Sequence, residues 1–235
     1  MPELPFITLI HKEGYQTAER WYPHAVENYK NAIKVSGDND DARRLKSNFA
    51  YSMQYIEYIE KQLRELNLSN VIVTMLYKSY IITSMSIIEA LFVNLLHHTG
   101  YWNTTIWEEF SAFGSNSKIV DGVNTKIETH LFRQVPEYDM RMDLDSMIKK
   151  IEKKHLLSID HNAFPALKIL RELRNRVHLQ IGNGPCDHDY NCFGNEEIQM
   201  MRRILYTILT SSEICSNPSI FNFIKECYIK NGGTI

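Results

Sequence analysis

The feature that most constrains this chain is an apolar stretch over residues 71–96, whose only charged or amide side chains are Lys78, Glu89 and Asn94. A membrane-spanning helix needs about 20 mostly apolar residues with few charges, so these interruptions favour a buried core helix. Its apolar side chains occupy nearly every face of a helical wheel. We therefore expect a helix over residues 70–98 at the centre of a bundle, ended by Gly100.

Further helices are expected on both sides of this central one. Over residues 42–66 the apolar side chains recur at three- and four-residue steps. Residues 36–41 form a polar turn that ends in good N-cap residues. The other expected helices span residues 15–35, 143–157, 164–180, 196–212 and 218–229.

The segment at residues 101–136 carries Gly114, Gly122 and several Ser and Asn residues, which predicts loops and short helices. No alternating strand pattern of useful length is evident. The sequence therefore predicts an all-α fold, a helical bundle with a long buried central helix and irregular insertions. A chain of 235 residues suits one domain over residues 1–235, with a core at about residues 45–215 and an added helix at each end.

Charge and cysteine content narrow the function classes. The net charge of -2 excludes a polycation, so any nucleic-acid contact must come from a local patch. The four cysteines all lie in the last quarter of the chain, unlike the dense pattern of a secreted disulfide scaffold. Residues 1–10 show no basic region followed by a long apolar run. We expect a cytoplasmic protein without a membrane segment.

One helical segment concentrates chemically capable side chains. At about 100° per residue, Arg171, Arg174, Asn175 and His178 fall within an arc of about 100°. The neighbouring arc is apolar and is expected to face the core; it contains Ala166, Ile169, Leu170, Leu173 and Val177.

Such a face suits a phosphate group. Guanidinium groups give bidentate, always charged donors to phosphate oxygens. Imidazole transfers protons near neutral pH, and the amide of Asn175 can orient the imidazole or a phosphate oxygen. The alternative interpretation is a solvated basic helix face on which His178 is a C-terminal cap.

The run of residues 170–178, Leu-Arg-Glu-Leu-Arg-Asn-Arg-Val-His, resembles the signature of the HEPN superfamily (higher eukaryotes and prokaryotes nucleotide-binding). That signature is an Arg, usually followed by Asn, Asp or His, with four to six residues before a His. Here Arg174-Asn175 gives the dipeptide but has only three residues before His178, whereas Arg171 has six residues before it but is followed by Glu172. Each Arg thus matches one part of the signature, and either is a candidate for the family position. The run at residues 84–92 is similar to the early HEPN core helix, which often holds an acidic residue.

The resemblance implies a HEPN-like bundle that acts as a metal-independent endoribonuclease. His178 would move a proton to or from the RNA 2′-OH or the 5′-oxygen, and Arg174, with Arg171, would stabilise the charged phosphorane. Asn175 would position His178 or the phosphate. No cofactor is implied. The alternative is a non-catalytic HEPN-like module that binds RNA, nucleotide or a partner protein; a third is a helical adaptor without a ligand.

The resemblance also implies partners. HEPN sites usually form across a dimer axis, which predicts a homodimer with paired His178 residues. A toxin or phage-defence effector of this kind would have an antitoxin protein. Glu89, if buried, needs a cation such as Arg171 or Arg174. It would then either orient that arginine for the site or form a purely structural ion pair. A basic stretch has two interpretations, a site that holds the RNA backbone and a solvated helix face; it comprises Lys149, Lys150, Lys153 and Lys154.

A weaker candidate site is a loop group of three metal-ligand types, Cys186, His188 and Cys192. It would hold zinc only with a fourth ligand from elsewhere, and its spacing matches no common zinc finger. Free thiols in an ordinary loop are the favoured interpretation, so we predict no metal.

Overall fold

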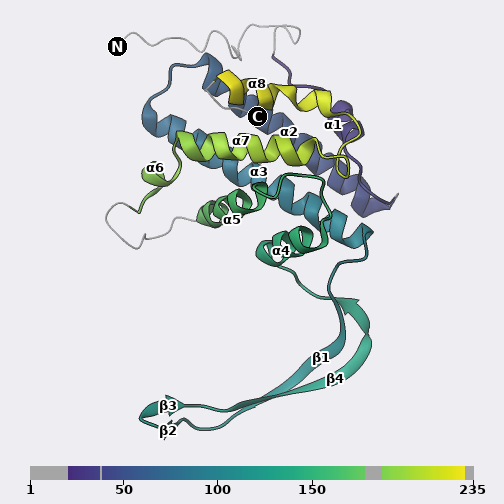
Figure 1. Ribbon diagram of the computed structural model, residues 1–235, viewed down its shortest axis with the longest axis vertical. Coiled ribbons are helices and arrows are strands. Elements are labelled where there is room, and N and C mark those ends of the chain that lie inside the picture. The colour runs from purple at the N-terminus through teal and green to yellow at the C-terminus, as the bar shows by residue number, and fades with distance from the viewer. Residues whose placement is uncertain (1–20, 38, 178–186, 231–235) are drawn as a thin grey trace, which may run out of the picture.

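A computed structural model describes residues 21–37, 39–177 and 187–230, with side chains to residue 227. A bundle of helices forms the body, and a long two-stranded ribbon projects from one end of it (Figure 1). The helices of the described part are α1 (Val26–Ala32), α2 (Asp40–Glu65), α3 (Asn70–His98), α4 (Leu144–Lys154), α5 (Ala163–Arg174), α6 (Asp189–Cys192), α7 (Asn195–Leu209) and α8 (Asn222–Lys230), with short 3₁₀ turns η2 (Asn175–Val177) and η3 (Pro218–Phe221). The strands are β1 (Thr104–Gly114), β2 (Lys118–Val120), β3 (Val123–Thr125) and β4 (Glu128–Asp139).

The central position predicted for the apolar helix is confirmed. Helix α3 spans the expected residues and packs against α2, α4, α5, α6 and α7. Gly100, with φ of +71°, follows its end, as a left-handed residue after a helix usually does. It is also the one helix in the described part that is long and apolar enough to cross a membrane, but 56% of its most apolar window is buried by the other helices, as in the core of a soluble protein.

Local capping explains where two of the neighbouring helices begin. The Asn39 side chain accepts a hydrogen bond from the Ala42 amide at 2.9 Å and starts α2. The Asp143 carboxylate accepts one from the Ser146 amide at 2.7 Å and starts α4. That bond lowers the pKa of Asp143, because it favours the charged form. Both caps satisfy amides that the helix itself leaves unpaired.

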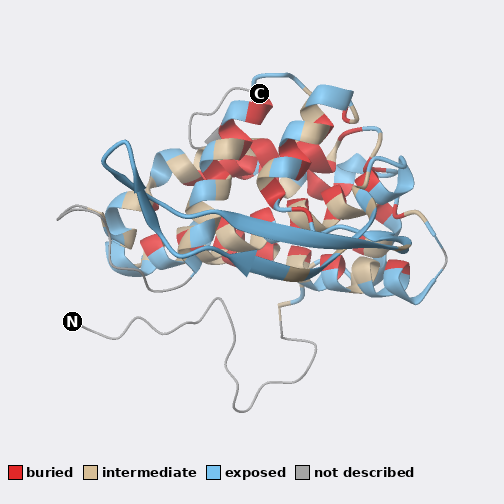
Figure 2. Cartoon of the chain, turned by 90° about the horizontal axis from the view of Figure 1, so that it is seen from below, coloured by how far each residue is buried: buried red, intermediate tan, exposed pale blue. Residues whose placement is uncertain are grey.

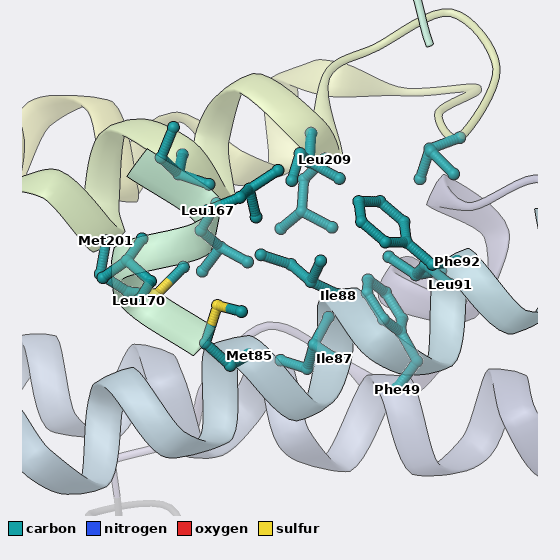
Figure 3. Packing of buried hydrophobic residues seen from close by; sticks show 14 of the residues in the cluster. Phe49, Met85, Ile87, Ile88, Leu91, Phe92, Leu167, Leu170, Met201 and Leu209 are labelled. Atoms are coloured by element: carbon teal, nitrogen blue, oxygen red, sulfur yellow. The ribbon is translucent and has the colours of Figure 1, made fainter. Parts of the chain in front are cut away.

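The core lies where α3 meets α5 and α7 on one side and α2 on the other. Figure 3 shows side chains from α3 interleaved with those of α5 and α7 above and with Phe49 of α2 below. Met85, Ile88 and Leu96 of α3 are fully buried, as are Leu167 and Leu170 of α5. Burial of these apolar side chains is the main force that holds the bundle together.

One ion pair lies inside this apolar body. Arg202 of α7 donates two hydrogen bonds to the Glu60 carboxylate of α2, each at 2.7 Å. The two side chains are only 4% and 3% exposed. The Tyr80 ring of α3 lies 6.0 Å from the Arg202 guanidinium carbon. Burial, followed by the nearby Glu60 charge, raises the pKa of Tyr80 well above its usual value and that of Cys227 to about 12.

The ribbon contradicts the prediction of an all-α fold, and the irregular insertion expected at residues 101–136 is wrong as well. Strands β1 and β4 pair antiparallel from Thr104 with Asp139 to Gly114 with Glu128, with two register shifts along β1. Strands β2 and β3 pair at the far end. We call residues 104–139 the arm. The chain is therefore a helical body with a β-ribbon arm.

The tip of the arm is a two-residue hairpin. Val120 pairs with Val123, and Asp121 and Gly122 between them have φ of +50° and +77°. Positive φ at both central residues is what a type I′ turn requires, and Asp-Gly is a preferred pair for it. The physical reason for the wrong fold class is that neither face of the arm is buried, so its strands carry no apolar alternation.

We predict that the buried ion pair is essential to stability. Glu60→Ala leaves Arg202 charged and unpaired inside the bundle, which should lower the free energy of unfolding by about 3–5 kcal/mol. Urea unfolding followed by circular dichroism measures it. Glu27→Ala is the control, because its pair with Lys30 is exposed and should matter by about 0.5 kcal/mol or less. Equal losses in the two variants would contradict the prediction.

Candidate functional site

The helix that carries the predicted site ends earlier than expected. Helix α5 stops at Arg174, and Asn175 to Val177 continue as a 3₁₀ turn in which Arg176 has φ of -80° and ψ of 21°. The prediction of one α-helix to about residue 180 is thus wrong at Asn175 to Val177, and its last residues lie outside the described part of the chain. A tightened last turn is common where the final carbonyls of a helix lack partners. His178 lies outside the described residues.

Arg174 continues the buried face of α5 and does not lie beside it. Ala163, Leu167 and Leu170 are buried at successive helical steps, and Arg174 occupies the next step. The apolar arc predicted to face the core is only partly correct. Ala166 and Leu170 are buried, but Ile169 is 49% and Val177 51% exposed. The packed face is rotated from the predicted arc toward the arginines.

Because of this rotation, Arg174 reaches the central helix. Its guanidinium donates a hydrogen bond to the Glu89 carboxylate of α3 at 2.5 Å. The Arg174 and Glu89 side chains are 34% and 27% exposed, so the pair lies at the edge of the core and remains open to solvent on one side. The expected cation for Glu89 is therefore present, and it is Arg174.

Arg171 faces a different helix. Its Nε atom is 3.4 Å from a carboxylate oxygen of Asp145 on α4. That Nε is buried and forms no hydrogen bond in the described part of the chain. Asp145 also pairs with Lys149, one turn further along α4. Arg171 and Arg174 thus leave the same end of α5 toward α4 and α3 respectively.

The chain returns to this end of α5 after the segment that contains His178. Arg176 forms an ion pair with Asp187, so residues 176 and 187 lie close together. Two residues on, Asp189 of α6 pairs with the buried Lys78 of α3 at 2.7 Å. The pair of Lys78 with Asp189 was not predicted from the sequence. A lysine inside an apolar helix was the available signal, since a buried ammonium group needs an anion.

The basic stretch of α4 is largely engaged with the chain itself. Lys149 pairs with Asp145, and Lys150 donates to the Tyr101 carbonyl at 2.8 Å and to the Asn103 side chain. Lys154 lies 5.1 Å from the Tyr101 ring centre, in cation–π geometry. Lys153 is exposed. Three of the four lysines thus have contacts that an RNA phosphate would have to replace or share.

The metal candidate has no built site in the described residues. Cys186 lies outside them. The His188 ring is 3.3 Å from the Asn191 side-chain amide, and the Cys192 thiol is 3.7 Å from an Asp187 carboxylate oxygen. Over residues 21–37, 39–177 and 187–230 no group of three or more His, Cys, Asp or Glu side chains is placed to hold a metal ion.

A pocket of about 830 Å³ lies elsewhere, where the start of α2, the end of α3 and the base of the arm meet. His97, His98 and Asp139 line it. The His97 ring stacks on Trp102, with ring centres 4.3 Å apart, and its Nδ1 is 3.8 Å from Asp139. None of the residues predicted for the phosphate site lines this pocket.

Comparison with family models, curated proteins and solved structures gives no match for this chain. A function is therefore inferred from the residues at the end of α5 and from their sequence pattern.

The Glu89–Arg174 pair should contribute measurably to stability. In a double-mutant cycle of Glu89→Gln and Arg174→Gln, we expect a coupling energy of about 0.5–1 kcal/mol, the range for pairs open to solvent. Urea unfolding of the four proteins measures it. Glu89→Gln combined with Arg171→Gln is the matched control and should show no coupling. A coupling between Glu89 and Arg171 instead would contradict the arrangement described above.

Proposed function

We propose that this protein is a metal-independent endoribonuclease of the HEPN type, with its site at the C-terminal end of α5. The observation that carries the proposal is the position of Arg174. Its guanidinium is held against Glu89 of the central helix, yet about a third of the side chain stays exposed. Asn175 follows directly and is exposed. A fixed but accessible guanidinium is the group that a phosphoryl transition state requires.

The reaction needs no metal, because RNA carries its own nucleophile. The 2′-oxygen attacks the adjacent phosphorus and loses its proton to a base, and the 5′-oxygen leaves with a proton from an acid. His178 is the residue that we assign to proton transfer. Arg174, assisted by Arg171, stabilises the negative charge on the phosphorane oxygens. The products are a 2′,3′-cyclic phosphate and a 5′-hydroxyl.

Glu89 acts in this proposal as a positioning residue. Its carboxylate holds one edge of the Arg174 guanidinium, which restricts the long side chain to a narrow range of orientations. Preorganised charge stabilises a transition state better than charge that must first be ordered. Asn175 is assigned to orient His178 or a phosphate oxygen.

A second candidate is a non-catalytic module that binds RNA, nucleotide or a partner protein. The observation that favours it is charge matching. Arg174 faces Glu89, and Arg171 approaches Asp145, so each guanidinium already has a carboxylate nearby. An anion must compete with those carboxylates, which lowers the affinity for phosphate and makes a protein partner the better match.

We further propose a cytoplasmic location, RNA as the substrate and a homodimer that brings two copies of the site together. A toxin or phage-defence role with an antitoxin protein fits a nuclease that needs no cofactor. The exposed Lys153 is the lysine of the α4 stretch that is best placed to meet an RNA backbone.

The decisive experiment uses purified full-length protein and a mixed single-stranded RNA substrate. Arg174→Ala and His178→Ala should each lower the cleavage rate by about 10²–10³-fold, the usual cost of removing a charge stabiliser or a proton-transfer group. EDTA should leave cleavage unchanged. The 3′ ends of the products should carry the cyclic phosphate.

Arg176→Ala is the matched control. It removes a neighbouring arginine that pairs with Asp187, and it should retain at least half of the activity. Circular dichroism of every variant verifies the fold. RNA binding without cleavage by the unmodified protein would favour the second candidate. Cleavage that survives both active-site substitutions, or that EDTA abolishes, would rule the proposal out.

A further inference from the structure

The arm exposes an unusual amount of apolar surface. It stands clear of the helical body (Figure 1), and nearly all of its residues have the colour of exposed residues (Figure 2). The exposed fractions of four of its large rings are Trp107 52%, Phe110 55%, Phe113 60% and Phe132 54%. Its exposed aliphatic side chains include Ile119, Val120, Val123, Ile127 and Leu131.

The strand register puts apolar side chains on both faces of the arm. Opposite residues in an antiparallel pair share a face, and successive residues alternate. Phe132 pairs with Glu109, two residues from Trp107, so Trp107 and Phe132 share one face. Leu131 pairs with Ser111, two residues from Phe113, which puts Leu131 and Phe113 on the other. Covering one side of the ribbon would leave the second apolar face in water.

The charges of the arm are largely matched within it. Arg133 donates two hydrogen bonds to Glu108, and the His130 ring lies 2.8 Å from Glu109. Lys126 pairs with Glu128. Over residues 104–139 there are three Lys and Arg against six Asp and Glu. This acidic balance disfavours nucleic acid and anionic lipid, which bind through Lys and Arg, and it leaves apolar contact as the main means of binding.

The exposed area matches what a stable homodimer needs. A buried aromatic ring covers about 150–250 Å², so four half-exposed rings leave about 400 Å² uncovered. The five aliphatic side chains, which are between 39% and 77% exposed, add roughly 300 Å² on the same scale. The total approaches the roughly 800 Å² that each partner buries in a standard interface. Soluble monomers rarely leave such a surface in water.

We propose that the arm is a dimerisation arm and that its partner is a second copy of this chain. The arm has two apolar faces, and each must pack against another surface to leave water. A second copy supplies two such surfaces, its helical body and its own arm. Length also fits. The 11 residues of β1 extend about 36 Å at roughly 3.3 Å per residue, and the 29 residues of α3 extend about 44 Å at 1.5 Å each. An arm can therefore cross most of the partner's body.

This inference does not depend on the proposed nuclease activity. It also differs from a dimer formed through the ends of α5, because it locates the contact more than thirty residues earlier in the chain. The two interfaces respond to different substitutions, so one experiment separates them.

The test is the mass of the full-length protein in sedimentation equilibrium at micromolar concentration. The unmodified chain should have twice its monomer mass of 27.5 kDa. The triple variant Trp107→Ser, Phe110→Ser and Phe113→Ser should have the monomer mass, with unchanged helical circular dichroism because these side chains lie outside the core. Tagged unmodified protein should also capture an untagged unmodified copy and fail to capture the triple variant.

The control variant carries Ile169→Ser and Tyr190→Ser, two similarly exposed apolar residues on the helical body, and should remain dimeric. A monomeric unmodified chain would overturn the proposal and would assign the arm to a different protein. A dimeric triple variant would overturn it in favour of another interface, such as the end of α5. Loss of the dimer in the control variant as well would also overturn it, since the effect would not be specific to the arm.

Discussion

The buried pair between Glu60 and Arg202 is the interaction on which the helical body depends. Removing two charges from water is costly, and the two hydrogen bonds recover that cost only in one relative position of α2 and α7. Apolar packing resists sliding between helices less sharply, because much of its energy depends on buried area. The ion pair does not tolerate sliding. Helix α3 packs against both α2 and α7, and its Tyr80 ring lies beside the Arg202 guanidinium, so the pair and the central helix share one packed interior.

Helix positions could be predicted from the sequence where nearby residues or a helical repeat of apolar side chains determine them. The bounds of α3 follow from its composition and from Gly100, and the start of α4 follows from the Asp143 cap. The arm was not predicted, because period-two alternation arises only when one face of a strand is buried. In β1 the large rings recur at Trp107, Phe110 and Phe113, a three-residue spacing that imitates a helix. The informative signal was the turn, Asp121-Gly122 between two valines.

At the candidate site, too, some features were predictable from the sequence and others were not. A carboxylate inside an apolar helix must have a cation, so a partner for Glu89 among the α5 arginines was predictable. The sequence did not indicate which arginine pairs with Glu89 or which face of α5 packs against the core. Leu167 and Leu170 set that rotation by their packing against α3 and α7, and they bring Arg174 inward while Ile169 turns to solvent. The end of α5 at Arg174 was equally hidden, since nothing in residues 175–177 breaks the helical pattern.

The root of the arm explains how so long a ribbon can leave the body in a defined direction. Lys150 of α4 binds the Tyr101 carbonyl and Asn103, and the Met140 amide donates to the Asn103 carbonyl at 2.8 Å, which closes the base of the ribbon. Beyond that base, cross-strand pairs contribute only about 0.2–1 kcal/mol each, and an isolated two-stranded hairpin is marginally stable in water. Lys150, one of the four lysines predicted to hold RNA, thus anchors the base of the arm. A second copy of the chain packed against the exposed rings would supply the further stability that a marginal two-stranded ribbon lacks.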